Sequence, residues 1–227
     1  MYEKIKDSLY KIKTERPSCT SYLIIDQQKI LLIDPGLYQK YPILKKELNN
    51  IGIKPEDIDM VINTHEHADH MGANKYFQNT ATIMTHRYAA TKIIYADEEV
   101  LHCRGHGHDP RGYNVHLWLE NNNVLELDDW FLKILYTPGH TSGSLCVYEP
   151  RKRILFSGDT VFSKGTISKI SDSGSYGEYI NSLSRLNTLK INQLLPGHGS
   201  VSNDVEEDIQ KALINAKSRH EEFLNIE

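Results

Sequence analysis

The chain has 227 residues, of which 39% are hydrophobic and 25% are charged, and its formal net charge is −4 at pH 7. The length fits one large domain or two small ones, and the composition is that of a globular protein. The acidic balance argues against a nucleic-acid-binding surface, which usually needs a basic face to neutralise phosphates.

The three cysteines, Cys19, Cys103 and Cys146, are far apart in the chain and form no C-x-x-C pair. A disulfide framework is therefore not expected, and the pattern favours a reducing compartment. The N-terminal residues lack the apolar stretch of a secretory signal, and no run approaches ~18 consecutive apolar residues. We therefore expect a cytoplasmic protein without a membrane segment.

The first part of the chain predicts strands and helices in alternation. Two β-rich runs joined by a Gln–Gln pair suggest a hairpin, and apolar residues at helical spacing then predict a helix that Gly52 ends. A strand, a helix, another strand and another helix are expected to follow. These elements cover residues 20–26, 29–34, 41–52, 59–64, 71–77, 81–85 and 86–100.

Periodicity is lost over residues 101–118, which contain two Gly–His pairs and an Asp–Pro pair. A long irregular segment of this kind is typical of a lid or binding loop, and we place a lid or insertion at 95–120. Beyond it, three strands, an amphipathic helix, a short strand and a terminal helix with Ser202 or Asn203 as N-cap are predicted. They cover residues 130–137, 144–149, 153–158, 176–190, 191–197 and 203–227.

No Pro-rich or low-complexity linker divides the chain, so residues 1–227 are interpreted as a single domain. Strands followed by helices occur twice, which suggests sheets packed face to face with helices outside, an α/β layered fold. Residues 20–85 and 130–195 are candidates for two halves of similar build.

The stretch NTHEHADHMG concentrates ionisable side chains at the end of the predicted strand 59–64. In extended backbone, side chains two residues apart point the same way, so His65 and His67 present two imidazoles to one point while Glu66 points away. Asp69 and His70 follow in the turn that opens the next helix and are expected to converge on a second point. One short peptide thus predicts ligands for two metal ions.

Three further candidate ligands, His140, Asp159 and His198, follow predicted strands and are flanked by glycine or proline. The total is five imidazoles and two carboxylates, a donor set that suits zinc, with iron and manganese as alternatives. The predicted partition places His65, His67 and His140 on one ion and Asp69, His70 and His198 on the other. Asp159 can bridge the two ions, because one carboxylate offers two oxygens, and a hydroxide would fill the remaining shared position.

At this point the chain resembles the metallo-β-lactamase superfamily. The matching motifs are THEHADH at 64–70, TPGHT at 137–141, GDT at 158–160, PGHG at 196–199 and DPG at 34–36. The resemblance implies an αββα sandwich with a dinuclear site at one edge of the sheets. Asp34 is expected to hold a turn behind the metals and to orient the ligands, and Asp69 to act catalytically by accepting the proton of the hydroxide.

Within that family the motifs are most similar to the hydroxyacylglutathione hydrolases (glyoxalase II). Two features differ. Only about 29 residues follow His198, where those enzymes carry a helical extension, and GTISK at 165–169 replaces their Cys–Gly–Arg stretch. Glutathione specificity is therefore not implied.

Four histidines lie in the irregular segment: His102, His106, His108 and His116. They fit a substrate lid or a solvated loop, and an accessory metal site is the alternative. Tyr176 is expected mainly in a helix core, with a substrate contact as the minor option.

Taken together, the residues predict a metal-dependent hydrolase of a small ester, thioester or lactone. A mononuclear iron persulfide dioxygenase is the first alternative, and a phosphodiesterase or nuclease is a weaker one. The expected partner is a small-molecule substrate, and a homodimer is left open.

Overall fold

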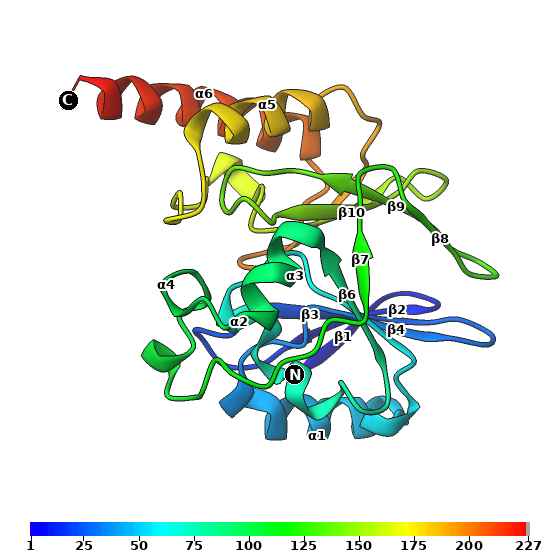
Figure 1. Ribbon diagram of the computed structural model, residues 1–227. Coiled ribbons are helices and arrows are strands. Elements are labelled where there is room, and N and C mark those ends of the chain that lie inside the picture. The colour runs from blue at the N-terminus through cyan, green and yellow to red at the C-terminus, as the bar shows by residue number, and fades with distance from the viewer. Residues whose placement is uncertain (226–227) are drawn as a thin grey trace. The chain divides into compact units, whose positions relative to one another are not determined.

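The computed structural model describes residues 1–225, which divide into two compact units. The first unit comprises residues 1–119 and 126–130, and the second comprises residues 120–125 and the chain from Phe131 onward. Each unit is built on one sheet with its own helices (Figure 1).

The first unit contains a seven-stranded sheet whose strands follow one another in chain order. Neighbours from β1 to β4 are antiparallel and neighbours from β4 to β7 are parallel, so the sheet is mixed. The strands are β1 (Tyr2–Lys6), β2 (Leu9–Lys13), β3 (Thr20–Ile25), β4 (Ile30–Ile33), β5 (Met60–Ile62), β6 (Thr82–His86) and β7 (Leu117–Leu119).

The predicted hairpin and first helix are confirmed. β3 and β4 pair across a turn in which Asp26 N donates to Lys29 O at 2.9 Å. The helix α1 (Tyr41–Ile51) ends at Gly52, whose φ of 91° is a left-handed conformation that glycine adopts without steric cost. Its buried Leu44 and Leu48 pack against the sheet, each contributing about 1.5–3 kcal/mol by burial, and Figure 1 shows α1 along one face.

The parallel arrangement brings chemically active residues to one edge of the first sheet. β4, β5 and β6 run in the same direction, so their carboxyl ends meet at that edge, where ligands of α/β proteins usually bind. Asp34 directly follows β4, His65 lies three residues after the end of β5, and His86 is the last residue of β6.

The helical predictions that follow these strands need correction. The helix expected over 71–77 begins earlier, as α2 (Ala68–Met71), and continues as the 3₁₀ helix η3 (Gly72–Tyr76). The helix expected over 86–100 is two helices, α3 (Arg87–Ile94) and α4 (Glu98–Leu101). Ala96 between them has a φ of 56°, which interrupts a right-handed helix.

Three strands of the first sheet were not predicted. β1 and β2 are short and carry several lysines, so they lack a strong apolar signal. β7 lies inside the segment predicted as a loop, together with the 3₁₀ helix η4 (Arg104–His106). Apart from these elements and Leu101, the last residue of α4, residues 101–118 are irregular, as expected.

The second unit contains a five-stranded sheet in the order β12-β11-β10-β9-β8. β9 to β11 are antiparallel and β12 pairs parallel to β11, so this sheet is also mixed. The strands are β8 (Val124–Glu126), β9 (Phe131–Tyr136), β10 (Leu145–Glu149), β11 (Ile154–Gly158) and β12 (Gln193–Pro196). β8 was not predicted, whereas the other four were.

Two helices, α5 (Tyr176–Leu186) and α6 (Val205–Leu224), cover this sheet (Figure 1). The predicted apolar stripe of α5 is confirmed by the buried Tyr179, Leu183 and Leu186, which share a core cluster with Leu155 and Leu194. α5 ends at Leu186, four residues earlier than the predicted end at residue 190.

The terminal helix begins differently from the prediction. Asp204, and neither Ser202 nor Asn203, occupies the N-cap of α6, while the Ser202 hydroxyl accepts from Asp204 N at 3.1 Å. The predicted extension of the helix to residues 226–227 lies outside the described part. α6 has 20 residues, and none of the helices in residues 1–225 is long and apolar enough to cross a membrane.

Candidate metal centre

The histidine segment of the first unit is held rigidly at the end of β5. Asn63 N donates to Met84 O at 2.9 Å, and the side-chain amides of Asn63 and Asn74 pair with each other at 2.7 and 3.2 Å. His67 then occupies the N-cap of α2, where its carbonyl accepts from His70 N at 3.0 Å. The backbone of the segment is therefore fixed on both sides of the histidines.

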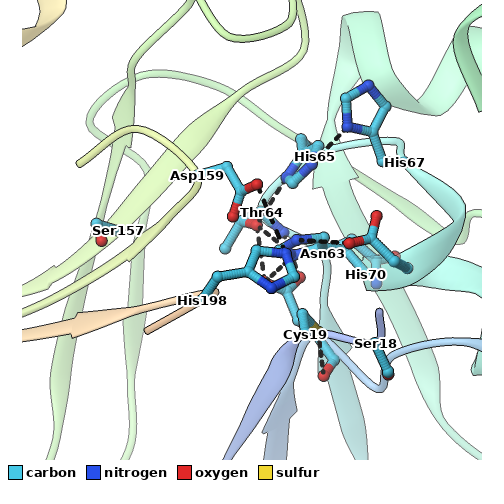
Figure 2. Close-up of polar contacts among 12 residues, drawn as sticks. Ser18, Cys19, Asn63, Thr64, His65, His67, His70, Ser157, Asp159 and His198 are labelled. Atoms are coloured by element: carbon cyan, nitrogen blue, oxygen red, sulfur yellow. Dashed lines mark hydrogen bonds and ion pairs between the residues drawn. The ribbon is translucent and has the colours of Figure 1, made fainter. Parts of the chain in front are cut away.

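His65 and His67 present ring nitrogens to each other, as the sequence predicts. His65 Nε2 lies 3.1 Å from His67 Nδ1, and Figure 2 shows the two rings meeting. His65 Nδ1 lies 3.2 Å from Thr64 Oγ1. Because the Thr64 hydroxyl donates its proton to Asp34, it accepts from His65 Nδ1, and His65 Nε2 then carries a lone pair. Two nitrogen ligands on one zinc lie roughly 3–3.5 Å apart, given Zn–N bonds of about 2.0–2.1 Å, so this pair fits an ion.

Asp34 fixes the orientation of His70. Its Oδ1 accepts from Thr64 N at 2.8 Å, and its Oδ2 accepts from Thr64 Oγ1 at 2.7 Å and from His70 Nδ1 at 2.9 Å. A carboxylate accepts, so the His70 proton resides on Nδ1 and Nε2 carries the lone pair. That Nε2 lies 3.8 Å from Asp69 Oδ2, which is too long for a hydrogen bond but suits two ligands of one ion.

Glu66 points away from the imidazoles, as predicted. Its buried carboxylate forms an ion pair of 3.0 Å with Lys92 of α3. The alternation of side chains along 65–67 therefore separates the ligand candidates from a carboxylate that ties the segment to α3.

Cys19 lies behind His70 and was not singled out by the sequence. Its thiol donates to the Asp34 carbonyl at 3.7 Å, and its sulfur lies in a buried cluster with the side chains of Asp34 and His70. Burial raises the pKa of this thiol to about 12, so it stays protonated at neutral pH. Asp34 and His70 are already joined by a hydrogen bond, and Cys19 lies beside both side chains.

In the second unit, His140, Asp159 and His198 converge. His140 Nε2 lies 3.8 Å and His198 Nε2 lies 3.7 Å from the same carboxylate oxygen, Asp159 Oδ2. Figure 2 draws Asp159 and His198 with their polar atoms facing each other. The three residues follow β9, β11 and β12, so the strand ends bring them together as predicted.

The tautomer of His140 is also fixed. Its Nδ1 donates to Lys169 O at 2.7 Å and lies 2.8 Å from Ser168 Oγ. A carbonyl oxygen can only accept, so Nε2 is the lone-pair nitrogen. Ser168 N in turn donates to the buried Tyr179 hydroxyl at 3.1 Å. Ser168 and Lys169 were missed because neither residue type signals a contact to histidine in sequence.

Gly139 makes the His140 turn fit its surroundings. Its φ is 142°, and a Cβ at this position would lie 2.3 Å from Tyr179 Cα. Only glycine lets the turn approach α5 this closely.

The four loop histidines have different environments. His102 lies beside a ligand candidate, with its ring 5.4 Å from that of His67. His116 Nδ1 accepts from Ile83 N at 2.9 Å, and the carbonyl of His106 accepts from Gln39. Within residues 1–225, no group of metal-binding side chains includes any of the four, so the alternative of an accessory metal site gains no support.

His108 and Tyr176 pack against aromatic rings. His108 stacks on Tyr38 with ring centroids 5.4 Å apart, whereas Tyr176 stacks on His220 of α6 at 5.7 Å. Tyr176 thus contributes to the α5–α6 contact.

Comparison with known proteins identifies the family. The family model that matches residues 15–198 is that of the metallo-beta-lactamase superfamily. A probable metallo-hydrolase of Methanocaldococcus jannaschii is 34% identical over 200 residues, covering 81% of this chain and 89% of that protein. A hydroxyacylglutathione hydrolase of Pelagibacter ubique is 31% identical over 74% of this chain, and an acyl-coenzyme A thioesterase of Bos taurus is 30% identical over 61% of it. The chain spans only 61% and 55% of these last two proteins.

Solved structures agree in fold. A metallo-beta-lactamase family protein of Thermus thermophilus has a TM-score of 0.80 at 20% identity, covering 96% of this chain and 82% of that one. A metallo-beta-lactamase of Cronobacter sakazakii has a TM-score of 0.78 at 17% identity, covering 99% and 97%. The fold predicted from the sequence is thereby confirmed, with two mixed sheets flanked by helices.

Proposed function

Because the chain belongs to the metallo-beta-lactamase superfamily and is similar to a probable metallo-hydrolase, we propose that it is a metal-dependent thioester hydrolase. Small esters and lactones are related acyl substrates of the same proposal. The proposal is supported by relatives named hydroxyacylglutathione hydrolase and acyl-coenzyme A thioesterase. At an identity of about 30%, the substrate specificities of those two proteins are not assigned to this chain.

One observation carries the proposal: two buried imidazoles are each held at Nδ1 by an acceptor. Asp34 Oδ2 holds His70 at 2.9 Å, and Lys169 O holds His140 at 2.7 Å. Both rings therefore direct a lone-pair Nε2 towards a carboxylate, Asp69 or Asp159. Metal-ligating histidines commonly have this arrangement, in which an outer acceptor fixes the tautomer and raises ligand basicity.

The donor set fits two divalent ions, with zinc as the expected metal and iron or manganese as alternatives. The proposed ligands are His65, His67, Asp69, His70, His140, Asp159 and His198. When bound, such ions would supply Lewis acidity towards the acyl carbonyl and a water ionised near neutral pH.

The protein's own residues perform the remaining steps. Asp69, whose side chain is 19% exposed, is the carboxylate proposed to accept a proton from the attacking water during hydrolysis of the thioester. Asp34 and Thr64 keep His70 in place through buried hydrogen bonds and do not touch the substrate. This preorganisation means that the ligands need no rearrangement during the reaction.

The proposal also includes the setting of the reaction. The three cysteines are free and buried, which supports a reducing compartment such as the cytoplasm. The net charge of −4 supports a small-molecule substrate over nucleic acid.

The test combines metal analysis with a panel of thioesters, esters and lactones. Chelation is expected to abolish thioester hydrolysis, and zinc is expected to restore it, with two ions per chain at full activity. One iron per chain with oxygen uptake on a persulfide would instead support the dioxygenase alternative. A fully metal-loaded protein that hydrolyses no acyl substrate would refute the proposal.

A further inference from the structure

A pocket lies in the first unit, in the segment that the sequence marks as irregular. It has a volume of about 360 Å³ and is lined by Arg104, Gly107, His108, Asp109 and Arg111. None of these residues belongs to the proposed metal ligands.

His108 is the buried wall of this pocket. Only 9% of the residue is exposed, its ring stacks on Tyr38 at 5.4 Å, and the edge of Tyr113 meets it at 6.2 Å. Neither ring nitrogen has a hydrogen-bond partner among residues 1–225. Since buried polar atoms are almost always hydrogen-bonded, a rigid imidazole with two unsatisfied nitrogens points to a ligand that completes it.

The charges around the pocket favour an anion. Asp109 is neutralised by Arg111, whose Nη2 lies 2.7 Å from its carboxylate, and this contact holds the pKa of Asp109 far below its usual range. The carboxylate of Glu98 accepts from Arg104 N at 2.6 Å, and Lys75 Nζ donates to the Asp109 carbonyl at 3.0 Å. Among the described residues the guanidinium of Arg104 has no ion-pair partner, so it is available to a ligand. Three cations, Arg104, Arg111 and Lys75, thus lie near two carboxylates, of which Asp109 is paired with Arg111 and Glu98 is held by a backbone N–H at Oε1 while its Oε2 has no hydrogen-bond partner among residues 1–225.

The pocket lies close to the histidine segment in the same unit. A Cβ built on Gly72, two residues after His70, would lie 3.5 Å from His108 Cε1. On the other side, His102 precedes Arg104 by two residues and has its ring 5.4 Å from that of His67. A substrate in contact with this segment can therefore reach the pocket with a charged extension.

We propose that this pocket binds the anionic group of the thiol carrier in a thioester substrate, with Arg104 and His108 as donors. The inference rests on the proposed thioesterase function, because it assigns the carrier half of that substrate. Burial lowers the pKa of His108, so its neutral ring donates one N–H to the oxyanion. Arg104 supplies the charge and the bidentate geometry that suits carboxylate or phosphate.

The kinetic test uses the metal-loaded protein and two kinds of thioester. One carries a charged carrier, glutathione or coenzyme A, and the other carries neutral N-acetylcysteamine. Arg104→Gln is expected to raise KM for the charged substrates roughly 10-fold, the loss of one charge-assisted hydrogen bond, and to leave the neutral substrate unchanged. The matched control is Arg219→Gln, which removes an exposed arginine from α6 and should change neither KM.

His108→Phe separates binding from packing, because phenylalanine retains the stack on Tyr38 and removes both nitrogens. We expect a similar rise in KM for the charged substrates, with an unchanged or higher thermal midpoint since a buried unsatisfied group is lost. Equal effects on charged and neutral thioesters, or equal effects of Arg104→Gln and Arg219→Gln, would overturn the assignment.

Binding without turnover keeps the two proposals distinguishable. The imidazole ¹⁵N resonances of His108, assigned from their absence in His108→Phe, are followed as S-methylglutathione or adenosine 3′,5′-bisphosphate is added. A saturable shift with only the first identifies a carboxylate carrier, and a shift with only the second identifies a phosphate carrier. No shift with either ligand refutes the pocket assignment, even if thioesters are hydrolysed. A shift in a protein that hydrolyses no thioester refutes the proposed function while the anion site stands.

Discussion

Two segments of the first unit are rich in histidine, and they differ in whether the Nδ1 atom of the imidazole donates or accepts a hydrogen bond. In the segment 65–70, His70 donates from Nδ1 to the Asp34 carboxylate at 2.9 Å, so Nε2 carries the lone pair. In the segment 101–118, His116 accepts at Nδ1 from the backbone N–H of Ile83 at 2.9 Å. The first arrangement suits the metal-ligand role proposed for His70, whereas in the second the imidazole bonds to the backbone of a neighbouring strand.

The difference teaches that the partner atom is more informative than the number of histidines. A carboxylate or carbonyl at Nδ1 leaves a lone pair at Nε2, and a backbone N–H at Nδ1 consumes the lone pair there. By this criterion His140, held by Lys169 O, belongs with His70. His86, whose Nδ1 accepts from Tyr88 N at 3.4 Å, belongs with His116.

The largest expected effect contrasts these two classes directly. His70→Ala and His140→Ala are expected to lose metal and to reduce kcat/KM by roughly 10³-fold or more, because the proposed ions would provide both the nucleophile and the charge stabilisation. His116→Ala should retain full metal content and activity within about 3-fold, since it removes one half-buried hydrogen bond to the backbone N–H of Ile83. Metal content by mass spectrometry and hydrolysis rates on one thioester measure both. Loss of metal in His116→Ala would break the distinction.

A second prediction uses the pH dependence of stability and concerns His86. Burial, with Arg87 and Lys92 nearby, lowers the pKa of His86 from 6.5 to about 4. Between these values the unfolded chain binds a proton that the folded chain does not, so the stabilising effect is complete above pH 6.5 and is lost as the pH falls towards 4. The free energy of unfolding should decrease by roughly 3 kcal/mol over this range from His86 alone.

His86→Asn isolates this contribution, because asparagine can still accept from Tyr88 N at the start of α3 but does not titrate. Urea unfolding at several pH values should show a shallower decrease for the variant than for the unchanged protein. Parallel curves for the two proteins would show that His86 is protonated in the folded state as easily as in the unfolded one.

The sequence predicted the strand-end positions of the ligand candidates because spacing alone determines them. His65 and His67 are two residues apart after a buried strand, and His140, Asp159 and His198 each follow an apolar run. Their roles as metal ligands remain predictions. The predicted fold is confirmed by the solved structures that share it. It was predictable because its main strands and helices have strong periodicity and clear stop signals such as Gly52.

What the sequence did not indicate depends on contacts between distant residues. Lys169 O holds His140 from 29 positions away through a backbone atom, which no residue type can reveal. Likewise, Ala96 has a φ of 56° and interrupts the predicted helix over 86–100, although alanine by itself favours helices. Strands β1, β2 and β7 are short and partly exposed, so packing rather than pattern defines them.

The smallest expected effect tests whether the acceptor at Nδ1 tunes the ligand or only supports the fold. Asp34 has a φ of 53°, which asparagine also tolerates, so Asp34→Asn should keep the turn while replacing the carboxylate that accepts from His70 with a neutral amide. Metal affinity should fall roughly 10- to 100-fold, as it does when outer partners of ligating histidines are changed.

Asp26→Asn is the matched control for Asp34→Asn. Asp26 is also a buried carboxylate that accepts from backbone N–H groups, those of Gln27 and Asp129, and neither of these bonds involves histidine. Both variants are expected to lower the thermal midpoint, but only Asp34→Asn should weaken metal binding in a competition titration with a chromogenic chelator. If the two variants weaken metal binding equally, the effect arises from general loss of stability. In that case the carboxylate at Nδ1 does not distinguish His70 from the other histidines.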